Sequence, residues 1–163
     1  MTKTINKPNK EEIKSLKLRN HHIQIMSQWL AEMKLSGNDT RVRNRFFVII
    51  SQRLNEIEAS KKEIVTKFAE KKDDKIVTEK KPVIDGTGAA AKLQDVPVFK
   101  DGNDEKADAE YLEVLQEEFV IDILPSTKGT LLGIGQLLTY TERTFDLNDG
   151  KVYDFICTQF EGI

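Results

Sequence analysis

The side chains that most often carry out chemistry are few in this 163-residue chain, which has two histidines and one cysteine. His21 and His22 are adjacent, so on a helix they point about 100° apart and cannot share a metal ion as an i,i+4 pair can. We expect both to be exposed residues at the start of a helix. Cys157 has no histidine near it in the sequence to act as a base for a nucleophilic thiol. We therefore expect it to be a small buried residue of an amphipathic helix.

Carboxylates form a second candidate group, in an acidic run that ends near Asp122. Glu110, Glu113 and Glu117 recur at helical spacing and share one helix face, where they could ligate a cation. A solvated face is the favoured interpretation. Residues 85–88 (DGTG) lack the spacing of a phosphate-binding loop and predict a plain turn. The sequence thus predicts no catalytic residue, no metal and no cofactor, and we expect the protein not to be an enzyme.

Arginines form the third candidate group. Arg41, Arg43 and Arg45 fall in the first two turns of a predicted long helix, where cations oppose the helix dipole. Arg53 follows two turns later, on the face of Arg41 and Arg45. Carboxylates of the chain itself, of a partner, or nucleic-acid phosphates could compensate these charges. We favour salt bridges, because no exposed aromatic residues for base stacking are interleaved with the arginines.

The distribution of charge along the chain also favours salt bridges over nucleic-acid binding. Residues 1–72 carry 16 Lys or Arg against 8 Asp or Glu, whereas residues 73–163 carry 9 against 19. Such asymmetry can mark a nucleic-acid-binding half. The net charge is only −2, however, and nucleic-acid binders usually have a basic surplus. We therefore expect the acidic half to pack beside the basic helix, within one subunit or between subunits.

The arginines belong to the element around which the chain is organised, a helix predicted from Asp39 to about Lys72. No Gly or Pro interrupts it, and Asp39 is the expected N-cap. At the standard rise per residue its length is about 50 Å. Apolar residues recur along one face at Val42, Phe46, Ile50, Leu54, Ile57, Ile64 and Phe68. Its far end needs a cover over Ile64 and Phe68, from another element or from a partner.

Shorter elements complete a helix-dominated α+β fold. Strands are predicted at 13–19 and 119–124, pairing into a small sheet. Two or three further helices are predicted from apolar spacing, at 104–119, from 126 or 127 onwards, and near the C-terminus. A helix over 21–34, capped by Asn20 and closed by a left-handed Gly37, forms an antiparallel hairpin with the long helix, because the loop between them is short. Asn148 or Asp149 is the expected cap of the last helix.

The domain organisation follows from composition. Residues 1–12 are polar and are expected to form a flexible arm, with a single α+β domain over 13–163. Residues 73–103 are rich in Gly and Pro turn signals and predict a β-hairpin or a mobile loop excursion. We find no apolar run typical of a secretion signal or a membrane span. A cytoplasmic protein with no membrane partner is expected.

Three segments together carry a resemblance to a known family. LKLRN at 16–20, LSGNDTRVRNRF at 35–46 and EEFVIDI at 117–123 are similar to small tailed-phage proteins of Gram-positive bacteria and their prophages, most of them uncharacterised. The resemblance covers roughly residues 14–72 and 108–124. Its most specific residues are Gly37, Thr40, Arg41, Arg43, Arg45 and Phe46. It implies a phage origin, in the cytoplasm of the infected host or associated with the virion, and it transfers no catalytic residue.

From these patterns we expect a non-catalytic phage protein that acts by binding proteins, as an assembly or virion-associated factor that self-associates. The partner is a second copy or another phage or host protein. The expected partner-binding residues are Arg41, Arg43, Arg45, Arg53, Ile64 and Phe68. Two alternatives stay open. One is an accessory protein that inhibits a host defence component, by binding a protein or sequestering a nucleotide signal. The other is a nucleic-acid binder that uses the arginine-rich helix start.

Overall fold

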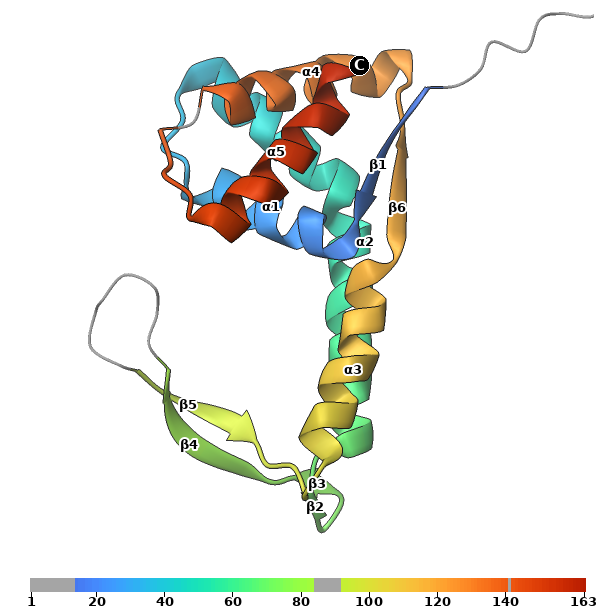
Figure 1. The fold of residues 1–163 in the computed structure, drawn as a ribbon, viewed down its shortest axis with the longest axis vertical. Coiled ribbons are helices and arrows are strands. Elements are labelled where there is room, and N and C mark those ends of the chain that lie inside the picture. Colours follow the sequence, from blue (N-terminus) through green and yellow to red (C-terminus); the bar gives the residue numbers. More distant parts are fainter. Residues whose placement is uncertain (1–13, 84–91, 141) are drawn as a thin grey trace, which may run out of the picture. The chain divides into compact units, whose positions relative to one another are not determined.

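The computed structural model describes residues 14–83, 92–140 and 142–163. The helices within these ranges are α1 (Asn20–Glu32), α2 (Gly37–Phe68), α3 (Asn103–Gln116), α4 (Pro125–Thr139) and α5 (Leu147–Glu161) (Figure 1). The strands are β1 (Ser15–Arg19), β2 (Lys71–Lys72), β3 (Lys75–Ile76), β4 (Thr78–Val83), β5 (Lys92–Pro97) and β6 (Glu118–Asp122). They pair into two-stranded sheets, β1 with β6, β2 with β3 and β4 with β5. This confirms a helix-dominated α+β fold with one long helix.

The chain divides into two compact units. Unit 1 contains Met1–Leu18, Ile25–Ile49 and Glu118–Ile163, and unit 2 contains Arg19–Gln24 and Ile50–Glu117. Both α1 and α2 contribute residues to each unit. The arm expected at 1–12 and the turn expected at 85–88 lie outside the described residues. No helix in the described ranges is both long and apolar enough to cross a membrane.

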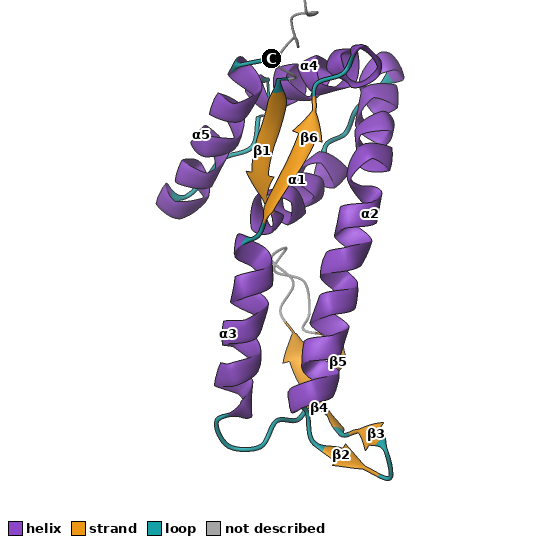
Figure 2. Cartoon of the chain, turned by 90° about the vertical axis from the view of Figure 1, so that its right-hand side faces the viewer, coloured by secondary structure: helices purple, strands orange, loops and turns teal. Residues whose placement is uncertain are grey.

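Unit 1 is built on the small sheet that the sequence predicted. β1 and β6 run antiparallel (Figure 2), and the amide of Ile123 donates to the carbonyl of Lys14 at 2.9 Å. Alternate residues of β1, Leu16 and Leu18, are buried, as expected for a strand with one face on a core. Four helices complete this core, whose buried side chains are Leu16, Leu18, Met26, Trp29, Leu30, Phe46, Ile121, Leu131, Ile134, Leu138, Ile156 and Phe160.

Two glycines of α4 weaken the helical pattern in the sequence, and the structure gives their reason. A Cβ at Gly133 would lie 2.7 Å from Cγ1 of Val42, and one at Gly135 would lie 3.2 Å from Cβ of Phe160. Real Cβ atoms essentially never approach another heavy atom as closely as 2.7 Å. The absence of a side chain at Gly133 therefore lets α4 pack closely against the first turns of α2.

We expect Gly133→Ala to lower the free energy of unfolding by about 1–3 kcal/mol, because the stiff Val42 side chain would be overpacked. Gly129→Ala is the matched control in the same helix, since nothing lies within 4 Å of a Cβ there. That variant should be stabilised by up to about 1 kcal/mol through the helix propensity of alanine. Urea unfolding of both variants checks the opposite signs. Equal stability of the two would contradict the close approach of Val42.

Unit 2 pairs the remainder of α2 with α3. Nζ of Lys67 lies 2.6 Å from Oε2 of Glu110, and the side-chain amide of Asn103 donates to the carbonyl of Phe68 at 3.4 Å. Near the other end of this pair Arg53 contacts Glu117 at 2.7 Å, so the two helices run antiparallel. The acidic half of the chain thus lies beside the basic helix in unit 2. Ile57, Ile64, Ala69 and Ala107 are buried.

The end of α2 differs from the sequence prediction. The helix ends at Phe68, and Lys71 and Lys72 form β2, which pairs with β3. Asp73 and Asp74, the two residues between these strands, have φ of 52° and 60°. Two left-handed residues in succession are typical of a type I′ hairpin turn, whose twist matches that of the strands. Residues 73–103 then continue into a second antiparallel hairpin, in which β4 pairs with β5 from Thr78↔Pro97 to Val83↔Lys92.

The predicted helix caps are only partly correct. Gly37 is left-handed as expected, with φ of 51°, but it is the first residue of α2. Asp39 consequently lies within the first turn of α2 and is not its N-cap. At α5 the cap is Asp146, whose carboxylate accepts from the amides of Asn148 and Asp149, each at 2.8 Å. The two residues expected to cap this helix are therefore the donors to the cap.

Candidate functional site

The arginines predicted to bind a partner fall into two groups, and Arg43 belongs to the group held by its own chain. Its Nη1 donates to the carbonyl of Leu30 at 3.1 Å and to that of Met33 at 2.8 Å. These carbonyls lie at the C-terminal end of α1, where the last carbonyls of a helix have no partner within the helix. Arg43 therefore satisfies carbonyls at the end of α1, within unit 1, while its side chain stays half-exposed.

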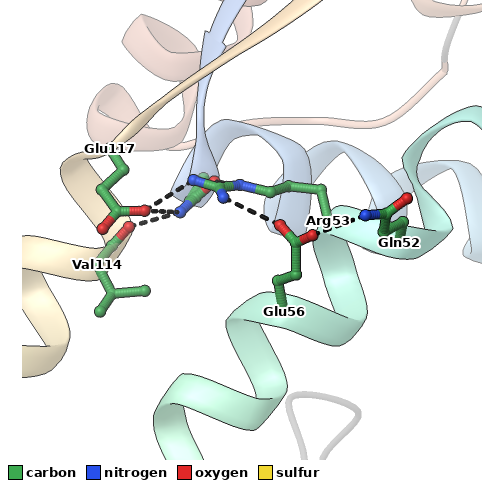
Figure 3. A network of polar contacts seen from close by, with 6 residues as sticks. Gln52, Arg53, Glu56, Val114 and Glu117 are labelled. Carbon is green, nitrogen blue, oxygen red and sulfur yellow. Dashed lines mark hydrogen bonds and ion pairs between the residues drawn. The ribbon is translucent and has the colours of Figure 1, made fainter.

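Arg53 is also engaged by its own chain, inside unit 2 (Figure 3). Its Nε donates to Oδ1 of Asn20 at 2.7 Å, its Nη2 to Glu117 at 2.7 Å and its Nη1 to Glu56 at 3.1 Å. Only 19 % of its side chain is exposed. This cation does have carboxylate partners, as its place in the sequence suggests, but they come from α2 and from the residue after α3 of the same chain.

Asn20 completes this network and is fully buried. Its Nδ2 donates to the carbonyl of Val114 at 2.6 Å, while its Oδ1 accepts from Arg53. Its backbone amide donates to the carbonyl of Glu117 at 3.0 Å. The side chain expected to cap α1 is therefore used to join α1, α2 and α3 within unit 2. Every polar atom of a buried amide needs such a partner, and Asn20 has them.

Arg41 and Arg45 form the second group and are exposed on α2. Neither forms an ion pair with another residue in the described part of the chain. Val48 follows three residues after Arg45 and therefore shares their helix face. The exposed fraction of Val48 is 75 %. We call the surface formed by Arg41, Arg45 and Val48 the arginine face. It combines two cations with an exposed aliphatic side chain.

The two apolar residues predicted to bind a partner are less accessible. Ile64 is only 5 % exposed, so it presents almost no surface to another molecule. Phe68 is half-buried, and Nζ of Lys67 lies 4.8 Å from the centroid of its ring. Residues of unit 2 itself therefore bury most of the apolar surface of Ile64 and Phe68 at the C-terminal end of α2.

Unit 1 contains an aromatic cluster that sequence reasoning missed. The ring of Trp29 lies 5.0 Å from that of Phe145 and 6.1 Å from that of Tyr153, measured between centroids. The guanidinium of Arg143 lies 5.9 Å from the Trp29 ring and also pairs with Glu32. These residues come from α1, α5 and the segment before α5. No local pattern in the sequence brings them together.

A cavity of about 600 Å³ opens beside this cluster. It is lined by Trp29, Glu32, Met33, Lys34, Leu35, Asp39, Leu137, Tyr140, Glu142 and Arg143. Three carboxylates and two basic side chains face it, and Arg143 is already paired with one of the carboxylates. The balance of charge therefore suits a neutral or cationic group better than a phosphate.

The histidines do not lie where the sequence suggested. His22 is buried, with an exposed fraction of 7 %, and its Nδ1 accepts from the backbone amide of Arg19 at 3.2 Å. Its ring centroid lies 3.9 Å from that of His21. Burial, followed by the charges of His21 and Arg19, lowers the pKa of His22 from 6.5 to about 4. The prediction of two exposed histidines is therefore wrong for His22, which is neutral at pH 7.

This lowered pKa predicts a pH dependence of stability. The unfolded state takes up a proton at His22 near pH 6.5, whereas the folded state resists protonation down to about pH 4. The free energy of unfolding should therefore fall as the pH drops from 6.5 to about 4. Urea midpoints across this window should fall less in His22→Gln, which has no proton to gain. His21→Gln should reduce the dependence less than His22→Gln does, because burial, and not the charge of His21, is the largest cause of the lowered pKa of His22. An unchanged dependence in His22→Gln would contradict the assignment.

Cys157 is half-buried in α5, slightly more exposed than expected. Burial is the main cause that raises the pKa of its thiol, and a raised pKa disfavours the nucleophilic thiolate. Its neighbour Tyr153 donates to the carbonyl of Leu138 at 2.7 Å, and burial raises the pKa of this hydroxyl to about 12. Both groups are therefore protonated at neutral pH.

Some carboxylates in and directly after α3 form ion pairs with α2, and others are exposed to solvent. Glu110 pairs with Lys67 and Glu117 pairs with Arg53, so they do not converge with Glu113 on one cation. Across residues 14–83, 92–140 and 142–163, no group of three His, Cys, Asp or Glu side chains is placed to hold a metal ion.

Comparison with known proteins adds no relative on which to base a function. No family model, no curated protein and no solved structure matches this chain. A function for this protein must therefore be inferred from its fold class and from the contacts of the chain itself.

Proposed function

We propose that this protein is a non-catalytic phage protein that acts by binding proteins, as an assembly or virion-associated factor that self-associates. The observation that supports this proposal is the arginine face. Its two arginines are exposed in the second and third turns of α2, and neither forms an ion pair within the described residues. Carboxylates of a partner would compensate both charges.

The chemistry of the arginine face suits a protein partner. Guanidinium groups bind carboxylates in a bidentate geometry and are enriched in protein interfaces. Val48 adds an apolar contact that becomes favourable only when a partner removes it from water. Nucleic acid fits less well, since Phe46 is buried and Phe47 is half-buried, which leaves no exposed ring beside the arginines for base stacking.

A phage origin is the part of the proposal that the sequence resemblance supports. The segments that carry it include the arginine-rich start of α2, so Arg41 and Arg45 of the arginine face are among the most specific residues of the resemblance. The proposed location is the cytoplasm of the infected host, with assembly into or onto the virion. The alternative of nucleotide sequestration is disfavoured by the carboxylates that line the cavity beside Trp29.

Charge reversal of the arginine face tests the proposal. In size-exclusion chromatography with light scattering, the wild type should have a molar mass above that of one chain at high concentration. R41E/R45E should shift to the mass of one chain, because attraction becomes repulsion at the contact. K71E/K72E is the matched control. It reverses the same number of exposed charges in β2 and should associate like the wild type.

Two results would contradict the proposal. The first is a strict monomer at every concentration that also binds no other phage or host protein. The second is binding to nucleic acid that weakens steeply with salt and is lost in R41E/R45E, which would instead establish phosphate contacts. Rescue of phage growth on a defended host by expression of this protein alone would favour the inhibitor alternative.

A further inference from the structure

We propose that the arginine face of one copy docks onto an acidic face of α3 in a second copy, with the two helices parallel. This inference rests on the proposed self-association and specifies its surface. The acidic face consists of Glu105, Asp108 and Leu112, and all three are exposed. Leu112 is 55 % exposed.

The acidic face is separate from the carboxylates that unit 2 uses internally. Glu110 and Glu117 form ion pairs with lysine and arginine of α2. Glu105 and Asp108 form no ion pair within the described residues. Residues three and seven positions apart share a helix face, so Asp108 and Leu112 both lie beside Glu105. This side of α3 therefore presents two carboxylates without an ion pair in the described residues, and one aliphatic side chain.

The two faces have matching patterns. Along α2, the order Arg41, Arg45, Val48 places charge, charge and aliphatic side chain over seven residues. Along α3, Glu105, Asp108 and Leu112 repeat this order over the same seven residues, a length of about 10 Å on each helix.

The matching order selects the relative direction of the helices. In a parallel arrangement, each arginine meets a carboxylate and Val48 meets Leu112. An antiparallel arrangement would instead place Val48 opposite Glu105 and remove the apolar contact. The parallel direction alone pairs opposite charges and apolar side chains at the same time, which both stabilises the contact and fixes its register.

Such a contact is heterologous, because it joins two different surfaces of the chain. Each copy offers one arginine face and one acidic face, so the contact repeats from copy to copy. Heterologous contacts produce closed rings or open filaments, whereas a contact between identical surfaces stops at a dimer. Assemblies larger than a dimer are therefore expected, unless two copies form the contact twice around a two-fold axis.

Two charge-reversal variants test the docking in the full chain. R41E/R45E makes both faces acidic, and E105R/D108R makes both faces basic. Each variant alone should self-associate at least about tenfold more weakly than the wild type, since like charges then face each other. An equimolar mixture should regain association, because each acidic α2 meets a basic α3 and each basic α2 meets an acidic α3. Sedimentation velocity measures the assemblies, and helical circular dichroism shows that both variants are folded.

The outcomes separate this inference from the proposed function. A wild type that stays monomeric and binds no partner overturns both. A wild type that associates while E105R/D108R associates equally well overturns the docking alone and leaves self-association in place. Loss of association in each variant without recovery in the mixture also overturns the docking. Recovery of association in the equimolar mixture of the two variants supports the docking.

Discussion

Replacing Trp29 with alanine is expected to lower the free energy of unfolding by about 3–5 kcal/mol, the range for buried large aromatic residues. The indole is only 4 % exposed. It contacts Phe145 edge-on at a centroid distance of 5.0 Å, and the loss of such a pair adds to the loss of buried area. The neighbouring rings come from a separate segment and cannot collapse fully into the space. Urea unfolding of both proteins at pH 7 measures the difference.

Tyr140→Ala is the matched control for this prediction. Tyr140 lies at the end of α4 in the same unit and is 82 % exposed, so its removal should change the urea midpoint little. A Trp29→Ala variant as stable as Tyr140→Ala would show that the aromatic cluster is not part of the core of unit 1.

The second large effect is expected for Asn20→Leu, which should lower the free energy of unfolding by about 2–4 kcal/mol. Leucine has the branched heavy-atom skeleton of asparagine but is larger and removes both of its hydrogen-bonding groups, so overpacking of this buried site adds to the loss. The carbonyl of Val114 and Nε of Arg53 then lose their partners at 2.6 Å and 2.7 Å. Leaving a buried acceptor and part of a guanidinium unsatisfied is strongly unfavourable. Urea unfolding measures this loss.

A second substitution identifies the cause. Arg53→Met should lower the free energy of unfolding less in the Asn20→Leu background than in the wild type, because the two residues share one contact. Gln52→Ala, at the exposed edge of the same network, should leave stability unchanged within error. Strictly additive effects of the substitutions at Asn20 and Arg53 would contradict the network in Figure 3.

Long periodic elements could be predicted from the sequence, and their ends could not. The spacing of apolar residues in α2 and the alternation in β1 depend on neighbours in sequence, so both elements were predicted correctly. Residues up to Lys72 have good helix propensity, yet α2 ends at Phe68. The amide of Glu70 donates to the carbonyl of Val98 at 2.7 Å. This pairing with a distant residue determines where the helix stops.

The candidate site shows the same division. Arg41, Arg43, Arg45 and Arg53 look equivalent in the sequence, because all follow the basic pattern of one helix. Only the positions of distant groups separate them, namely the last carbonyls of α1 for Arg43 and Glu117, directly after α3, for Arg53. Two exposed arginines are left for a partner.

The burial of His22 was missed for a similar reason. Its position at the start of α1 predicts exposure, and the contacts that hold it are the amide of Arg19 and the ring of His21. The aromatic cluster around Trp29 is equally non-local, since it joins α1 to residues more than a hundred positions later. Periodicity within one helix carries no information on such contacts.

The central claim, that exposed charges on this chain bind a second copy, is tested most directly by sedimentation equilibrium of the wild type. We predict that the weight-average mass rises with protein concentration at about 0.1 M salt and falls towards that of one chain at about 1 M salt, where charges are screened within a few ångströms. A mass equal to one chain at all concentrations and both salt levels would contradict the account.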